Sequence, residues 1–206
     1  MRVKVLQTMN WSDISLIVGC IVLSFVLFLA YCGAFHVITF RTAQPYERDL
    51  HVAYFHTRGP YKDCGPLFSK VLKIFGGKSP MFALYHDNPR EVAADQCRYA
   101  VGVLLPNELS NETTAVLKSN GLCQHTLPTI EKAFMTDFPA TSFLSCFFMV
   151  IKVYGNMEYH MKEANIGTDF GKAPFIELHN HVPGHVRVFM PLEKQERFVL
   201  PEFSAT

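Results

Sequence analysis

The stretch LYHDNPREVAADQCRYAVG, from Leu84 to Gly102, carries the clearest structural signal in the chain. Asp87-Asn88-Pro89 is a turn sequence, because Asp and Asn side chains bond their own backbone and proline fixes one backbone angle. The flanking segments PMFALYH and CRYAVGVLL are rich in apolar and β-favouring side chains, which predicts two strands. We therefore expect Asp87, Asn88, Pro89, Cys97, Arg98 and Gly102 to serve the fold rather than chemistry.

Outward from this stretch, the same order of elements is predicted twice. In the first half, LHVAYFH (Leu50–His56) is a strand, and apolar residues at helical spacing follow it up to a Gly76-Gly77 stop. In the second half, GLCQHTLP precedes a helical run from Thr141 to Ile166, a break at TDFGKAP, and the strands FIELHN and HVRVFMPL. Each half reads strand, helix, strand, strand. This order predicts an α+β fold, residues 50–194, with two helices on an antiparallel sheet and a ligand-sized groove between the halves.

A membrane anchor is predicted before this domain. From Ile14 to Phe40 there is no Asp, Glu, Lys or Arg, and about 20 apolar residues suffice to cross a bilayer. A cleavable signal peptide is the alternative, but its apolar core would be shorter, and Ala30-Tyr31-Cys32 is a poor cleavage site. We expect a short segment at 1–13, the anchor at 14–38, a linker at 39–49 and a short tail at 195–206.

Charge restricts the partners but not the orientation. Among the 206 residues, 19 Lys and Arg balance 18 Asp and Glu, so the composition argues against a nucleic-acid partner. Basic residues flank the anchor almost equally, so the positive-inside comparison does not choose a side. The flanking basic residues are Arg2 and Lys4 before the anchor, and Arg41, Arg48 and Arg58 after it.

The cysteines form no disulfide or zinc pattern. Cys20 and Cys32 lie in the predicted anchor, and Cys64, Cys97 and Cys123 are an odd set without a C-x-x-C spacing. We expect reduced thiols in a cytosolic domain. The sequence therefore gives no reason to expect a structural metal or a disulfide framework.

Several motifs carry a family resemblance. RGPY, FALYHDNP and CRYAVG are similar to the GyrI-like (SOUL-related) ligand-binding fold, which is built from two half-repeats. Together with FPATS, PFIELH, VFMPL and FVLPEF, they resemble the testis-expressed protein 264 family, single-pass proteins of the endoplasmic reticulum (ER) known as ER-phagy receptors. The residues that carry the resemblance are Tyr85, Asp87, Asn88, Pro89, Asp95, Cys97, Arg98, Ala100, Val101 and Gly102.

The resemblance implies a luminal N-terminus, a cytosolic domain and an adaptor role at the ER membrane, with autophagy or AAA-ATPase machinery as partners. Family receptors carry a long acidic tail with a short motif for the ubiquitin-like modifiers of autophagy. In LEKQERFVLPEFSAT no acidic cluster precedes an aromatic-x-x-aliphatic motif. WSDI (Trp11–Ile14) has this aromatic-x-x-aliphatic form, but it abuts the membrane. We expect a short member that does not bind the modifiers directly. Asn111 would accept a glycan only in the lumen.

The resemblance also implies a ligand site. GyrI-like domains place a glutamate of a second-half strand in the groove, and Glu177 of PFIELH matches it; Tyr61 and Tyr85 are candidate groove aromatics. A carboxylate among aromatic rings suits a small amphipathic cation. Two alternatives remain open: Glu177 is an outward residue of an alternating strand, and the tyrosines are core residues.

No enzyme, cofactor or metal is expected. Neither G-x-S-x-G nor H-E-x-x-H occurs, and no acid is paired with a base. His179, His181 and His185 have a spacing that could hold zinc, but polar residues of a hairpin explain them more simply. Arg98 follows a turn, where we expect it to bond loop carbonyls or the Asp87 carboxylate.

Overall fold

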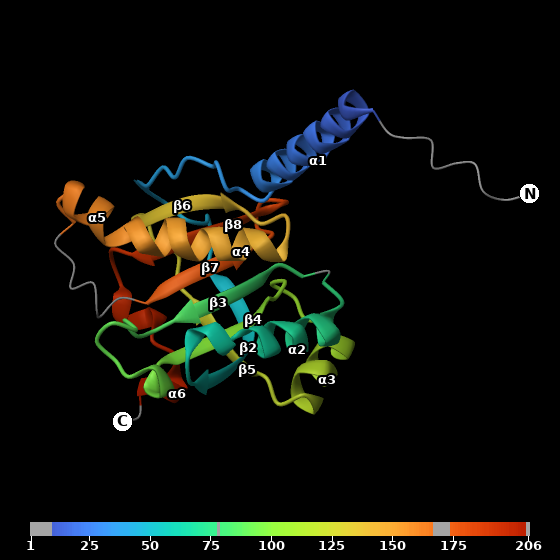
Figure 1. Cartoon of the computed structure of the whole chain (residues 1–206). Helices are drawn as coiled ribbons and strands as arrows, with labels where there is room; N and C mark the ends of the chain where they lie inside the picture. The colour runs from blue at the N-terminus through green and yellow to red at the C-terminus, as the bar shows by residue number, and fades with distance from the viewer. Residues whose placement is uncertain (1–9, 78, 167–173, 205–206) are drawn as a thin grey trace, which may run out of the picture.

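The computed structural model describes residues 10–77, 79–166 and 174–204. Most of the expected segment 1–13, with Arg2 and Lys4, lies outside the described residues, as does most of the break TDFGKAP. The domain is one antiparallel sheet of eight strands with a layer of helices on one face (Figure 1) and the C-terminal segment on the other. The strand order is β1-β6-β8-β7-β3-β4-β2-β5. The strands are β1 (Arg41–Ala43), β2 (Leu50–Arg58), β3 (Met81–Tyr85), β4 (Arg98–Leu104), β5 (Cys123–Leu127), β6 (Ala133–Pro139), β7 (Phe175–His179) and β8 (His185–Pro191). The α-helices are α1 (Trp11–Tyr31), α2 (Gly65–Phe75), α3 (Asn111–Ser119), α4 (Phe143–Met149), α5 (Gly155–Glu163) and α6 (Pro201–Ser204).

The two half-repeats are present. In the first, β2, α2, β3 and β4 follow one another, and in the second the order is β6, the α4–α5 helical run, β7 and β8. Strands β3 and β7 pair with each other and join the halves into one sheet. We call this boundary the seam. The predicted α+β class and the repeated strand-helix-strand-strand order are thus confirmed.

Two strands were placed wrongly from the sequence. The GLCQHTLP segment forms β5, but β5 pairs with β2 of the first half, and the first strand of the second half is β6. The short strand β1, inside the expected linker, pairs in turn with β6. The segment before the second half thus supplies an edge strand, β5, to the first half. The segment before the first half supplies an edge strand, β1, to the second half. Chain order alone does not reveal this exchange, because strands that follow one another in the sequence are neighbours in the sheet in only about two thirds of cases.

The helix layer follows from apolar spacing. Helix α2 ends at Gly76, whose φ of +63° favours glycine and stops the helix. The run from α4 to α5 is continuous except for a π-helical turn, η3, at Val150–Tyr154. In Figure 1 α2 covers the first half of the sheet and α4 the second. The seam thus runs between the two helices.

The opposite face of the sheet is covered by the C-terminal segment. Phe198, Leu200 and Phe203 are buried in the same core cluster as Tyr54 and Phe82. The segment expected as a short tail at 195–206 therefore belongs to the domain in its described residues, because these apolar side chains close the core. The expected linker is likewise part of the domain, since the Tyr46 ring packs in this cluster.

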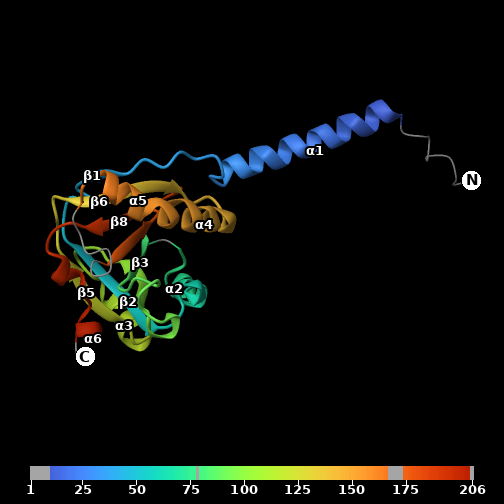
Figure 2. The same ribbon diagram turned by 60° about the vertical axis from the view of Figure 1, so that its left-hand side comes forward.

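Helix α1 projects from the domain (Figure 2). It is the one helix in the described ranges that is long and apolar enough to cross a membrane. None of its most apolar 18-residue stretch is buried inside the protein. It ends at Tyr31 rather than at the predicted residue 38, because Gly33 has a φ of +87° and its N–H bonds the Ala30 carbonyl. Cys32 is buried in the domain.

Candidate functional site

Glu177 lies at the centre of the seam. It is in β7, directly opposite Ala83 of β3, and its neighbours Ile176 and Leu178 point into the core on the other face of the sheet. Alternation along the strand therefore turns the Glu177 side chain toward the helices. The residue is 3% exposed, so the alternative of an outward, solvated glutamate is wrong.

Three polar side chains surround the carboxylate. The Tyr154 hydroxyl donates to Oε1 at 2.7 Å, and the Tyr85 hydroxyl donates to Oε2 at 3.4 Å. The His179 Nε2 lies 3.0 Å from Oε2. Tyr154 comes from the π-helical turn η3 and Tyr85 from β3 of the other half. Both half-repeats therefore contribute to the site, and π-turns often mark such positions.

Aromatic rings enclose these polar groups. The Phe68 ring of α2 meets the His179 ring edge to face at 5.2 Å, and the Tyr85 ring meets those of Tyr61 and Tyr99. On the other side, the Tyr154 ring packs against Phe175 at 5.9 Å. The rings present both edges and faces toward the polar groups. A cation in this setting would be stabilised by the ring quadrupoles as well as by the charge of Glu177.

The electrostatics keep the tyrosines neutral. Burial, and then the charge of Glu177, raise the pKa of both Tyr85 and Tyr154 well above the ordinary value. Burial and the same carboxylate raise the pKa of Cys64, whose sulfur lies 3.9 Å from the Tyr85 hydroxyl. Tyr85 and Tyr154 are thus protonated at neutral pH and can donate to the Glu177 carboxylate. The arrangement is suited to holding a buried carboxylate and to pairing it with a cation.

The Tyr61 ring belongs to this aromatic setting, and its hydroxyl bonds the turn at Asp87. Its hydroxyl accepts the Asp87 N–H at 2.8 Å and lies within bonding distance of the Asp87 and Arg98 carbonyls. The Arg98 guanidinium donates to both Asp87 carboxylate oxygens and to the Phe203 carbonyl. This is the pairing that the sequence predicts for Arg98, and it joins the turn to α6.

The remaining motif residues are structural in position. The Asn88 amide bonds Glu91, the Cys97 thiol points at loop carbonyls, and Pro89 lies within the turn. A Cβ on Gly102 would lie 2.0 Å from the Ala53 carbonyl oxygen, so only glycine fits there. Asn111 is exposed at the start of α3.

The histidine triplet does not assemble into a metal site. His179 bonds Glu177, and His185 Nδ1 lies 3.1 Å from the Pro183 carbonyl. The ligand atoms that do converge, within 4.8 Å of one another, are those of His56, Cys123 and Glu202. No sequence motif marks this group, because its residues come from the separate elements β2, β5 and α6.

Burial and the hydrogen bond to Glu202 raise the pKa of the Cys123 thiol in this group to about 11. The Glu202 carboxylate already accepts a hydrogen bond from Tyr54 at 2.9 Å.

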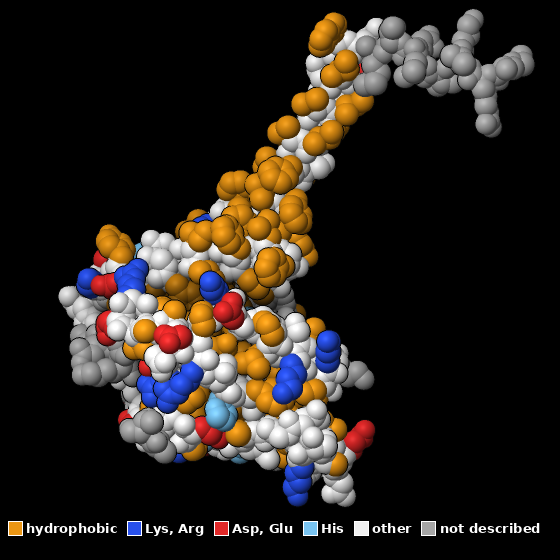
Figure 3. Space-filling model, turned by 60° about the horizontal axis from the view of Figure 1, so that its bottom comes forward, with side chains coloured by type: hydrophobic (Ala, Val, Ile, Leu, Met, Phe, Trp, Pro, Cys, Tyr) orange, Lys and Arg blue, Asp and Glu red, His pale blue; other side chains and the backbone are white. Residues whose placement is uncertain are grey.

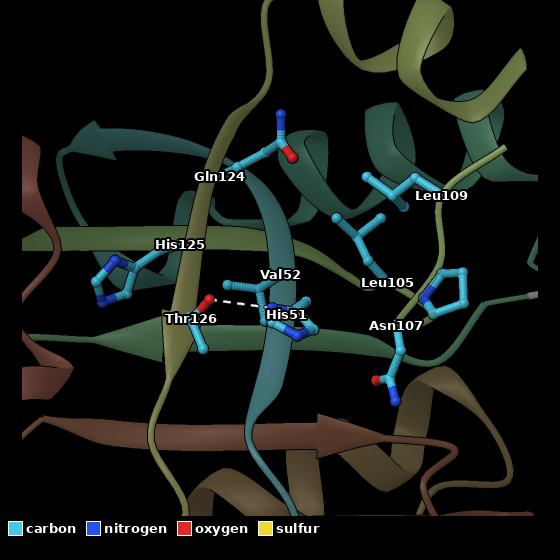
Figure 4. A pocket seen from close by; sticks show the side chains of 9 residues that line it. His51, Val52, Leu105, Asn107, Leu109, Gln124, His125 and Thr126 are labelled. Atoms are coloured by element: carbon cyan, nitrogen blue, oxygen red, sulfur yellow. Dashed lines mark hydrogen bonds between the residues drawn. The ribbon is translucent and has the colours of Figure 1, made fainter. Parts of the chain in front are cut away.

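Two hollows lie away from Glu177. One, of about 250 Å³, is lined by His51, Leu105, Leu109 and Thr126 among others (Figure 4), and its His51 ring bonds the Thr126 hydroxyl. A larger hollow of about 880 Å³ shares His51 and Leu105 with it. Glu177 lines neither hollow, and its side chain is buried among the groups around it.

Comparison with known proteins identifies sequence relatives. The chain is 26% identical over 189 residues to testis-expressed protein 264 of Homo sapiens, a match that covers 90% of this chain and 58% of the relative. The homolog of Mus musculus is 27% identical over 182 residues, covering 87% of this chain and 57% of its own. The expected relationship to testis-expressed protein 264 is thus confirmed, and the chain spans less than three fifths of these relatives' length. No family model matches the chain.

Solved structures give only weak overlaps. A hydrolase from Listeria innocua has a TM-score of 0.44 and 11% identity, covering 80% of this chain and 98% of that one. The C-terminal domain of EcmrR has a TM-score of 0.42 and 11% identity, covering 75% of this chain and 97% of that one. Overlaps at this level support no inference about activity or ligand.

Proposed function

We propose that this chain is an adaptor of the ER membrane, held by α1 and presenting its α+β, GyrI-like domain to the cytosol. One observation carries the proposal: the similarity to testis-expressed protein 264 covers about nine tenths of the chain, so it includes most of the domain. The adaptor role is the one that the resemblance to ER-phagy receptors implies. Its partners would be proteins of autophagy or an AAA-ATPase.

The free cysteines support a cytosolic domain, and close attachment to α1 supports a role at the membrane. All six cysteines are free thiols, as is usual in a reducing compartment. The domain is also attached closely to α1, since the Lys152 ammonium donates to the Ala34 and His36 carbonyls at 2.7 Å. A domain held against the membrane in this way is suited to recruiting proteins to it.

Proximity labelling tests the adaptor role. The full chain and its anchor, residues 1–49, are each fused to a labelling enzyme and expressed in the same cells. The proposal predicts a set of cytosolic proteins labelled by the full chain and not by the anchor. Identical labelling by the two fusions would refute it.

A second candidate function is binding of a small amphipathic cation at the seam. The observation that favours it is the buried Glu177 carboxylate, with Tyr85 and Tyr154 as donors and aromatic rings around it. Burying a carboxylate is costly, and a cationic ligand would offset part of that cost.

A thermal-shift screen of organic cations tests this candidate. A cation that raises the melting temperature of the wild type should have no effect on Glu177→Gln, which keeps the shape but removes the charge. Glu108→Gln, at an exposed glutamate, should respond like the wild type. If no cation raises the melting temperature, the seam is a structural feature only.

A further inference from the structure

Helix α4 exposes an apolar surface. Residues from Phe138 to Ile151 include no charged side chain, and the outward positions of the helix are all apolar. Phe143 is 92% exposed and Phe147 55%, and both Val150 and Ile151 are more than half exposed. We call Phe143, Phe147, Val150 and Ile151 the α4 patch. Beyond it, the exposed face of α5 becomes polar, at Asn156 and Glu163 for example.

The α4 patch begins where α1 ends. The Thr141 hydroxyl donates to the carbonyl of Tyr31, the last residue of α1, at 2.8 Å. The Ser142 hydroxyl, at the N-cap of α4, lies 3.1 Å from the Cys32 sulfur. Lys152, just after the patch, bonds the carbonyls of the loop that follows α1. The start and the end of the patch are thus both attached to the chain that leaves the membrane helix.

Helix length places this junction at the membrane surface. The 21 residues of α1 span about 31 Å at about 1.5 Å per residue, close to the roughly 30 Å thickness of a bilayer's hydrocarbon core. When α1 spans the bilayer, Tyr31 therefore lies at the boundary, where tyrosine is favoured. Thr141 bonds Tyr31, so Phe143, two residues further, lies at the same level.

The figures agree with this placement. In Figure 2 α4 protrudes from the side of the domain from which α1 departs, and Figure 3 shows hydrophobic side chains continuing from α1 onto the body of the domain. Phe35 and Val37, in the loop between them, are also largely exposed. Contiguous exposed apolar surface of this kind marks a contact site.

We propose that the α4 patch is a lipid-contact surface, which rests on the same leaflet from which α1 emerges and buries its phenylalanines among the lipids. Apolar side chains without charge at this depth partition into the headgroup and acyl-chain boundary. The inference rests on the membrane anchoring in the proposed function, but it needs neither the adaptor role nor the cytosolic orientation.

Depth-sensitive fluorescence tests it on the full chain. Trp11 is the only tryptophan, so Trp11→Phe gives a silent background for Phe147→Trp. The matched control is Leu109→Trp, an exposed apolar position next to the N-cap of α3. Helix α3 lies at the end of the domain far from α1 in Figure 1. The variants are placed in phosphatidylcholine nanodiscs with and without bromine on the acyl chains.

The proposal predicts that bromolipid quenches most of the emission at position 147 and that aqueous acrylamide has little effect there. At position 109 acrylamide should quench and bromolipid should not. Acrylamide quenching at 147 like that at 109 would overturn the proposal. So would protection at 147 from both quenchers, which would indicate a protein contact. In the unmodified chain, bromolipid quenching of Trp11 reports insertion of α1, so failure of the patch is distinguishable from failure of the anchor.

Discussion

Tyr154 donates a 2.7 Å hydrogen bond to the buried carboxylate of Glu177. The bond joins the π-helical turn of the helix layer to the central strand β7, and it is shorter than the contacts of the carboxylate with His179 and Tyr85. Because an ionised group that loses a donor in a buried site has no water to replace it, this bond should contribute to stability as well as to the chemistry of the seam.

Removing that donor should destabilise the domain. We expect Tyr154→Phe to lower the free energy of unfolding by about 1–3 kcal/mol, the cost of a lost hydrogen bond to a buried charged group. Tyr159→Phe is the matched control, because Tyr159 bonds Glu163 on the exposed face of α5. Thermal unfolding in detergent measures both. A double-mutant cycle with Glu177→Gln should show coupling; additive effects would contradict a direct interaction.

Gly102 and Gly155 should respond to alanine with opposite signs. A methyl at Gly102 would meet the Ala53 carbonyl oxygen at 2.0 Å and the Phe82 ring at 2.8 Å, so the strands must separate, at a cost of roughly 3 kcal/mol or more. Gly155, at the start of α5, has nothing within 4 Å of the added methyl, and Gly155→Ala should stabilise by about 0.5–1 kcal/mol. Equal melting temperatures for the two variants would contradict the close packing of β4 against β2.

Asp87 should contribute to the acid sensitivity of the fold. Burial alone would raise its pKa, but hydrogen bonds from the Arg98 side chain and backbone outweigh burial and hold the pKa of Asp87 below its ordinary value. Its stabilisation is therefore complete above the unfolded pKa of about 3.9 and is lost as the pH falls through the lower folded value.

Asp87→Asn should therefore cost roughly 2–3 kcal/mol at pH 7 and much less at the acid end. Melting temperatures recorded from pH 7 down to pH 2 measure the difference between variant and wild type. A difference that stays constant over this range would show that the ion pair with Arg98 is not the source of the stabilisation.

His86 should act in a different pH window. It is 5% exposed, and its Nε2 has no hydrogen-bond partner among the residues the structure describes. Burial, together with nearby Arg98, lowers the pKa of His86 to about 4. The unfolded chain binds the proton near pH 6.5, so stability falls as the pH drops from 6.5 toward 4, by up to about 3 kcal/mol.

His86→Leu should remove this part of the pH dependence and leave stability at pH 7 nearly unchanged, because an unsatisfied buried nitrogen is replaced by an apolar group of similar size. His51→Leu, at an exposed position, serves as the control. Parallel stability curves for wild type and His86→Leu between pH 6.5 and 4 would rule out a neutral buried His86.

Much of the architecture could be predicted from the sequence because its signals are local. The Asp87-Asn88-Pro89 turn, the helical spacing that ends at Gly76 and the repeated order of elements all depend on neighbouring residues. Strand β6 was missed because it is buried on both faces, so no polar alternation marks it. The exchange of β1 and β5 between halves depends on pairing across the whole chain, for which no local pattern exists.

The candidate site was predictable only in part. Glu177 was identified by its motif, but its partner Tyr154 was not, because the π-helical turn that aims Tyr154 at the carboxylate has no sequence signal. Tyr61 was expected in the groove, yet its hydroxyl is used by the Asp87 backbone. The surface on α4 was not anticipated either, because the sequence of an apolar helix does not show which of its side chains stay exposed.

The orientation of the domain tests the central claim most directly. The full chain with a C-terminal tag is made in microsomes, then treated with protease from outside and examined for a glycan at Asn111, which is exposed at the start of α3. A membrane-anchored adaptor with a cytosolic domain predicts a digested tag and no glycan. A protected tag and a glycosylated Asn111 would place the domain in the lumen and contradict the adaptor function.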